Sequence, residues 1–171
     1  MVLFWHNHFA TEAKDVQIPQ LMYNQNQTLR QHALGNVKDL VKAVTRDPAM
    51  LIYLDGRLNR VGSPNENYGR ELLELFTMGV NNYTQKDVAE AARALTGWTV
   101  NGLQAEFQAR RFDAGTKTFL GKTGAFNDTE VVDIVFDQWQ TAVFICRKLY
   151  RELVYQEPEE AVVAELADTL R

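Results

Sequence analysis

The chain has 171 residues, of which 46% are hydrophobic and 23% charged, a composition typical of one globular domain. Its 18 basic and 22 acidic residues give a net charge of −4, and its longest basic run is Arg110-Arg111, so no nucleic-acid partner is expected. The single cysteine excludes an intrachain disulfide and a cysteine zinc site. No apolar run approaches the ~20 residues of a transmembrane helix, so no transmembrane segment is expected in this chain.

Both ends of the chain lack the features that usually close a domain. An amphipathic pattern continues to Arg171 without a capping glycine, and hydrophobic sequence begins at residue 2 without a polar lead-in. We therefore expect residues 1–171 to form a single helical domain that is truncated at both ends, a fragment from the middle of a longer protein.

The first helices follow from hydrophobic spacing and from residues that start helices. Apolar residues recur every three or four positions between Leu29 and Val44, which predicts one helix over about 28–46. Asp47 is expected to cap a short helix that begins at Pro48 and ends near residues 55–56.

Two capping boxes mark the next pair of helices. Ser63 and Glu66 have this spacing, which predicts a helix over 64–78 that Gly79 closes in a left-handed conformation. Thr84 and Asp87 form a second box, for a helix that continues to about residue 96. The two helices are expected to form a hairpin, and the alanines of the second allow another backbone to approach closely.

The helical period is lost between residues 98 and 124. Residues 105–113 and 116–120, separated by Ala114-Gly115, predict a small β-hairpin inserted around residues 105–120. Thr129 is then expected to cap a short helix through Phe136, and apolar residues from Trp139 to Leu153 predict a long helix. The expected fold is mainly α, a multi-helix domain with this hairpin insertion.

The three histidines form the first candidate site. Neutral imidazoles with carboxylates suit zinc, iron or manganese, so His6, His8 and His32 are candidate ligands of a divalent transition metal. Residues two apart on a helix diverge by about 200°, so one ion reaches both His6 and His8 only where the helix ends or extends. The alternative is structural, with His8 pairing with Glu12 and His6 half-buried.

The predicted 64–78 helix supplies candidate carboxylates. Projection at about 100° per residue places Leu75 on an apolar arc and Glu71 about 40° away at its edge. Glu66 lies on the polar face, where it is expected to pair with Arg70. A carboxylate at a core boundary can be a metal ligand or a general base, so Glu71 and Glu66 are candidate catalytic residues. The alternative is a solvated face of ion pairs.

A second polar site is predicted at the start of the same helix. Asn65 and Asn67, with Asn59 and Asp55 before them, stand where free backbone amides and the positive end of the helix dipole favour an anion. Arg70 completes the polar group. The alternative is turn chemistry, because asparagine side chains often imitate turn backbone.

Several motifs taken together resemble one family. They are Phe4-Trp-His-Asn-His-Phe9, His32-Ala-Leu-Gly35, Asp47-Pro-Ala-Met50, Asn65-Glu-Asn67, Arg70-Glu-Leu-Leu-Glu-Leu-Phe76, Ala91-Ala-Arg-Ala-Leu-Thr-Gly-Trp98 and Lys117-Thr-Phe-Leu-Gly121. The chain resembles the bacterial family catalogued as domain of unknown function 1800. The resemblance implies a predominantly helical fold and an exported bacterial protein, at the periplasm or cell surface. It implies no reaction, cofactor or catalytic residue.

Two functional hypotheses follow. In the first, the domain is a metal-dependent hydrolase of the cell envelope, with histidine ligands and with Glu71 or Glu66 as a ligand or as the general base that activates water. In the second, it is a non-catalytic helical scaffold that binds another envelope protein or a polymer. Convergence of the histidines with Glu71 in one cleft favours the enzyme, and their separation favours the scaffold.

Overall fold

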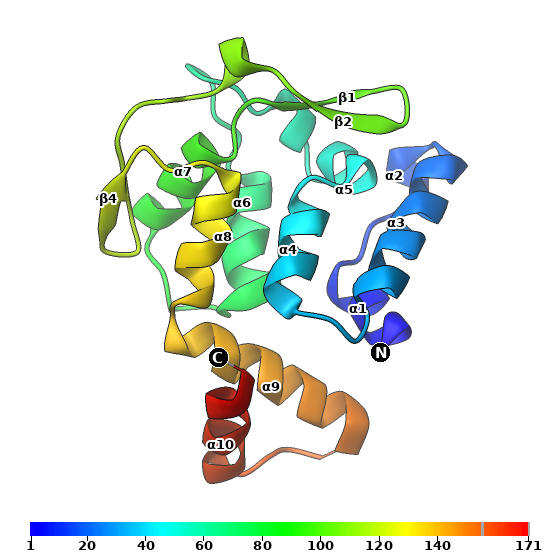
Figure 1. The fold of residues 1–171 in the computed structure, drawn as a ribbon, viewed down its shortest axis with the longest axis vertical. Coiled ribbons are helices and arrows are strands. Elements are labelled where there is room, and N and C mark those ends of the chain that lie inside the picture. Colours follow the sequence, from blue (N-terminus) through cyan, green and yellow to red (C-terminus); the bar gives the residue numbers. More distant parts are fainter. Residues whose placement is uncertain (155, 171) are drawn as a thin grey trace.

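The computed structural model describes residues 1–154 and 156–170 (Figure 1). Its fold is mainly α, as predicted, and it contains two small antiparallel β-hairpins. The N-terminal helices are α1 (Val2–His8), α2 (Ala13–Val16), α3 (Pro19–His32), α4 (Val37–Thr45) and α5 (Pro48–Tyr53), followed by the 3-10 turn η1 (Gly56–Leu58). The central elements are α6 (Asn67–Glu71), the π-helix η2 (Leu72–Thr77) and α7 (Gln85–Ala94). The later elements are β1 (Trp98–Asn101), β2 (Gln104–Phe107), the 3-10 turn η3 (Ala109–Arg111), β3 (Lys117–Phe119), β4 (Lys122–Gly124), α8 (Asp128–Phe136), α9 (Trp139–Val154) and α10 (Glu160–Leu170).

The helix predicted over 28–46 is two helices, so that prediction is wrong. The chain turns between His32 and Val37, where the Gly35 amide donates to the His32 carbonyl. Asn36 then caps α4, because its side chain accepts from two backbone amides of the first turn. The apolar spacing runs across this break because both helices face the same core. By contrast, Asp47 caps α5 with Pro48 at the first position, as predicted.

The predicted Ser63–Glu66 capping box is also wrong. Ser63 pairs with Arg60 in an isolated β-bridge, and helix α6 begins only at Asn67. The buried Asn59 side chain accepts from the Asn65 amide at 2.9 Å and donates to the Ala92 carbonyl at 2.8 Å. These two hydrogen bonds hold the segment before α6 in a non-helical conformation and connect it to α7.

After Glu71 the helix widens into the π-helix η2. The Met78 amide donates to the Leu73 carbonyl at 2.8 Å, five residues earlier, and the Thr77 hydroxyl donates to the Leu72 carbonyl at 2.5 Å. The wider turn rotates the later positions away from an α-helical projection. Leu75, predicted on the apolar arc, is therefore 50% exposed.

The second capping box and the helical hairpin are confirmed. The Thr84 and Asp87 side chains each accept from the other's backbone amide at the start of α7, and Gly79 has a left-handed φ of 76°. Helix α6 approaches α7 so closely that a Cβ added at Gly69 would lie 3.3 Å from the Ala92 nitrogen and the Val88 oxygen.

The single hairpin predicted around 105–120 is two hairpins. Strand β1 pairs with β2 and β3 pairs with β4, whereas the predicted pairing of 105–113 with 116–120 does not form. The tight turns stand at Gly102 and Gly121, which have positive φ, rather than at Ala114-Gly115. The segment between the hairpins contains η3.

The last three helices form the C-terminal part of the described chain. Asn127, not the predicted Thr129, caps α8 by accepting from the Glu130 amide. Helix α9 packs on α8 and η2 with one part of its surface and on α10 with another, so that the α9–α10 pair projects from the body (Figure 1). None of the helices in the described residues is both long and apolar enough to cross a membrane.

Candidate functional site

His8 is the one predicted metal ligand that is buried, with 6% of its surface exposed, at the end of α1. Its Nε2 lies 2.9 Å from the Phe76 carbonyl oxygen at the end of η2. Because a carbonyl only accepts hydrogen bonds, this contact assigns the ring hydrogen to Nε2 and leaves a lone pair on Nδ1. The predicted pairing of His8 with Glu12 is wrong, since Phe76 takes its place.

The surroundings of His8 keep its ring neutral. Phe4, Trp5 and Phe9 pack around it with ring centroids 4.5–5.7 Å away. Burial is the main cause that lowers the pKa of His8 to about 4, the nearby Lys148 ammonium lowers it further, and the Phe76 carbonyl opposes the shift. A neutral imidazole with a free lone pair can accept a hydrogen bond or bind a metal.

The three histidines do not assemble one metal centre in the described part of the chain. His6 is exposed on α1 rather than half-buried, and His32 is half-buried at the end of α3. Nowhere in residues 1–154 and 156–170 do three His, Cys, Asp or Glu side chains lie close enough to hold one ion. Binding of a metal by fewer of these ligands stays a prediction.

Glu66 and Arg70 connect α6 to α7 at the surface. The Arg70 guanidinium donates to the Glu66 carboxylate at 3.2 Å, which confirms the predicted pair, and to the Gln85 side-chain oxygen at 3.0 Å. The Gln85 amide nitrogen in turn donates to Glu66 at 2.7 Å. This closed set of three contacts stabilises the helical hairpin and is a structural use of both predicted site residues.

The two asparagines of the predicted polar site belong to the turn before α6. The Asn65 amide donates to Asn59, and the Asn65 side chain accepts from the Asn67 amide at 2.9 Å. These contacts satisfy backbone amides within the turn. Helix α6 has five residues, which is too short for an anion site built on its dipole.

Glu71 stands half-buried at the junction of α6 and η2. Burial raises the pKa of its carboxyl group, the nearby Glu74 raises it further, and Arg70 opposes the shift. The Glu74 carboxylate accepts a hydrogen bond from the Tyr83 hydroxyl at 2.6 Å. Glu71 thus has the raised proton affinity of a general base.

Lys148 is a site residue that the sequence patterns miss. It stands on α9, on the side away from the apolar positions that define this helix in the sequence. Its ammonium lies 3.4 Å from the Leu75 carbonyl oxygen and 5.2 Å from the centre of the Phe144 ring. Only the packing of α9 on η2 shows that this lysine lies near His8, because the two residues are far apart in sequence.

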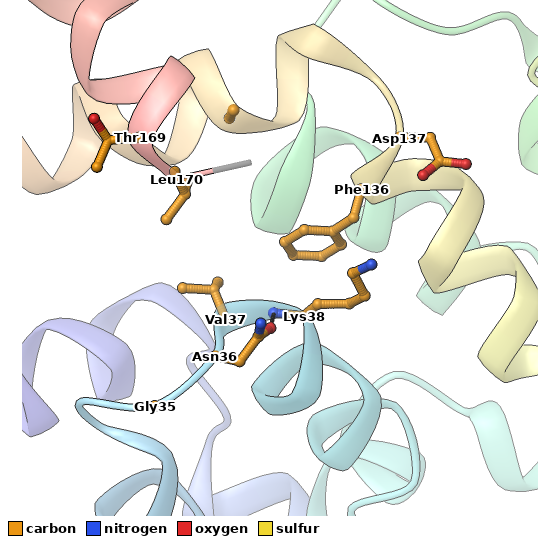
Figure 2. Close-up of a pocket in the computed structure, with 9 residues that line it drawn as sticks. Gly35, Asn36, Val37, Lys38, Phe136, Asp137, Thr169 and Leu170 are labelled. Atoms are coloured by element: carbon orange, nitrogen blue, oxygen red, sulfur yellow. Dashed lines mark hydrogen bonds between the residues drawn. The ribbon is translucent and has the colours of Figure 1, made fainter.

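Three surface depressions are relevant to binding. A crevice of about 360 Å³ lies where the segment before α4, the end of α8 and the end of α10 meet, and Figure 2 shows side chains from all three converging there. A pocket of about 300 Å³ lies between α1 and α9, lined in part by His8 and Lys148. A groove of about 420 Å³ lies between α9 and α10 and is lined almost entirely by apolar side chains.

The fold and these surfaces define a helical domain with two small β-hairpins. The chain belongs to the family described as Protein of unknown function (DUF1800), whose model matches residues 1–171. Searches of curated proteins and of solved structures returned no match.

Proposed function

We propose that this domain is a non-catalytic helical scaffold of the bacterial cell envelope, which binds an amphipathic helix of another envelope protein in the α9–α10 groove. The location rests on the resemblance to an exported family. The separation of the predicted site residues supports a scaffold over an enzyme: Glu66, Arg70 and Asn65 are engaged in contacts that connect structural elements.

The apolar groove is the observation that carries this proposal. Leu153 is 62% exposed on α9, and Leu166 and Leu170 are 40% and 36% exposed on α10. They line the groove together with Leu149 and Tyr150. Apolar side chains that gather in one exposed groove, instead of standing singly, are typical of interaction sites.

The shape and the rim of the groove favour a helix as the occupant. Its lining residues on α9 recur every three or four positions, so α9 and α10 both present apolar side chains to a third helix. Ion pairs of Arg147 with Glu160 at 2.8 Å and of Arg151 with Glu157 at 2.5 Å provide charges of both signs beside the α9–α10 connection. An amphipathic helix matches both features, because its apolar stripe is flanked by charged residues.

A peptide titration tests this binding mode. The isotope-labelled chain is titrated with a designed amphipathic helix that has leucines at positions i, i+3, i+4 and i+7, and with a peptide of the same composition in scrambled order. We expect the patterned peptide alone to shift the resonances of Leu149, Leu153 and Leu166. Leu153→Glu should weaken binding roughly tenfold or more, because a carboxylate loses water in the apolar groove.

Leu34→Glu is the matched control, since Leu34 is 89% exposed and lies outside the groove, in the turn before α4. Equal binding of the scrambled peptide, or equal weakening by the two leucine substitutions, would contradict the proposal.

The metal-dependent hydrolase is the second candidate, and the raised pKa of the half-buried Glu71 is the observation that favours it. Its test is metal content by mass spectrometry after incubation with zinc, manganese and iron, for the unmodified chain, His6→Ala and Glu71→Ala. About one bound ion that both variants lose would favour the enzyme over the scaffold. Absence of a bound ion from the folded chain after this incubation would contradict the metal-dependent hydrolase.

A further inference from the structure

Two loops that are far apart in the sequence join to form an arginine-rich surface. They are residues 56–63, which contain η1 and the turn after it, and residues 108–112, which contain η3. The Arg111 guanidinium donates to the Arg57 carbonyl at 2.6 Å, and the Val61 amide donates to the Arg111 carbonyl at 2.7 Å. Because these contacts hold the loops side by side, residues 56–63 and 108–112 are together called the arginine surface.

The arginine surface has a positive charge that its own surroundings do not neutralise. It contains no acidic residue, and its basic residues are Arg57, Arg60, Arg110 and Arg111. None of these four arginines belongs to an ion pair among the described residues. The flanking Glu66 and Asp113 each pair with an arginine outside the surface. The other flanking carboxylates are Asp55 and Glu106, and when both are set against the four arginines the net charge is still +2.

This positive charge is a local feature, because the chain as a whole has a net charge of −4. Attraction of the whole molecule to an anionic partner is therefore not expected, and only a partner that meets the arginine surface itself gains from these charges.

The arginine surface also exposes apolar side chains among its charges. Leu58 is 56% exposed and Val61 is 46% exposed, and each follows an arginine directly in the sequence. Arg60 and Ser63 pair across a tight turn, where Gly62 has a φ of 78° and an added Cβ would meet nothing within 4 Å. Every residue of this turn is exposed. The turn therefore projects into solvent and presents basic and apolar side chains together.

This combination matches the surface of a membrane that contains anionic phospholipid. Guanidinium groups stay charged at physiological pH and bind phosphate oxygens through paired hydrogen bonds. Exposed leucine and valine side chains gain free energy at the boundary between headgroups and acyl chains, which a dissolved polyanion does not offer. We propose that the arginine surface binds peripherally to a bilayer containing anionic phospholipid, with its guanidinium groups on lipid phosphates and with Leu58 and Val61 in the interfacial region.

The arginine surface is separate from the α9–α10 groove. Strand β1 contacts η1, and η3 follows β2 directly. Strands β1 and β2 lie at the end of the molecule opposite the α9–α10 pair (Figure 1). Attachment through the arginine surface leaves the groove free for a partner, so this proposal goes beyond the scaffold function and does not depend on it.

Vesicle sedimentation with the whole chain tests the proposal. Vesicles of phosphatidylcholine alone are compared with vesicles of equal parts phosphatidylcholine and phosphatidylglycerol. We expect the chain to sediment with the mixed vesicles only, and the bound fraction to fall as salt is added, because salt screens charges at a surface. Arg60→Gln and Arg110→Gln should each weaken the partition onto mixed vesicles about fivefold, which is the contribution of one basic residue at an anionic membrane surface.

Matched substitutions elsewhere on the chain are the controls. Arg30→Gln changes the net charge by the same amount at an exposed position of α3, and it should leave the partition nearly unchanged. Leu58→Gln combined with Val61→Gln should weaken the partition roughly fivefold at high and low salt alike, because it removes the apolar contribution. Leu3→Gln combined with Leu34→Gln is its control, since these leucines are 69% and 89% exposed and lie outside the arginine surface.

Equal binding to both kinds of vesicle, or equal weakening by Arg60→Gln and Arg30→Gln, would overturn the proposal. Soluble polyphosphate that binds as tightly as the mixed vesicles, with no loss in the Leu58–Val61 variant, would also overturn it and assign a dissolved polyanion instead. All substituted side chains are exposed, and circular dichroism checks that each variant is folded. The α9–α10 groove is unchanged in every variant, so this proposal and the scaffold proposal can fail separately.

Discussion

Two buried titratable residues have opposite effects on how stability depends on pH. His8 has its pKa lowered from 6.5 to about 4, mainly by burial. Asp47 has its pKa raised from 3.8 to about 6, also mainly by burial, although its carboxylate accepts from the Met50 amide and the Gln25 side chain at 3.0 Å each. The folded state binds a proton less readily than the unfolded state at His8, and more readily at Asp47.

The sign of each effect follows from these shifts. The contribution of His8 to stability is lost as pH falls from 6.5 toward 4, because the unfolded chain takes up the proton first. The contribution of Asp47 is lost as pH rises from 3.8 toward 6, because the unfolded chain releases the proton first. Each of these two pKa changes corresponds to roughly 3 kcal/mol of stability, so the two contributions nearly cancel between about pH 4 and pH 6.

Removal of the Asp47 charge should make the opposing effect visible. Asp47→Asn retains an oxygen that can cap α5, so the helix start is preserved. We expect the unmodified chain to lose on the order of 3 kcal/mol relative to this variant between pH 4 and pH 7. Urea unfolding at a series of pH values measures this difference. Asp15→Asn, at an exposed position of α2, is the control. Parallel stability curves for Asp47→Asn and the unmodified chain would show that the account of Asp47 is wrong.

Sequence patterns predict a residue's role well where the partner is local. Thr84 with Asp87, and Asp47 before Pro48, act as predicted because their contacts depend on three or four consecutive residues. Asn59 and Lys148 contact residues that are remote in the chain, such as Ala92 and Leu75. No local spacing indicates such contacts, so these roles appear only in the folded structure.

At the scale of elements, the close approach of α6 to α7 depends on Gly69. A Cβ at this position would meet two backbone atoms at 3.3 Å, and backbone within a packed helix cannot easily move aside. Gly69→Ala should therefore destabilise the chain by about 1–3 kcal/mol, despite the higher helix propensity of alanine.

The urea midpoint of Gly69→Ala measures this effect, with Gly35→Ala as the control. An added Cβ at Gly35 would have its nearest contact at an ordinary distance of 3.6 Å, so little change is expected there. A Gly69→Ala variant as stable as the unmodified chain would show that the α6–α7 spacing can adjust.

The errors in predicted elements share one physical cause. The periods of 28–46 and 64–78 report which face is buried, and residues on both sides of the turn before α4, and in both α6 and η2, belong to the same hydrophobic core. The β-hairpins likewise depend on where the backbone can take positive φ, and residues 98–124 offer several glycines. The sequence therefore predicts whether a segment is helix or strand better than it predicts where the element begins and ends.

At the scale of the whole molecule, α9 lines two separate surface depressions. One side of this helix lines the apolar groove with α10, and another lines the pocket beside α1. The predicted His–Glu site does not draw its residues together in this arrangement: His6 is exposed on α1, His32 ends α3, and Glu66 connects α6 to α7. Hydrophobic spacing and capping residues predict a helical domain, whereas the surfaces of this domain depend on how distant helices pack.

Site-specific photo-cross-linking in the cells that produce the protein tests the scaffold proposal most directly. A photoreactive amino acid replaces Leu153 in the groove or, as a control, Leu34 outside it, and the cross-linked peptides are sequenced. We predict one discrete adduct from position 153, joined to a segment of another exported protein whose apolar residues recur with helical spacing. Adducts that are the same from both positions, or none from position 153, would contradict docking in this groove.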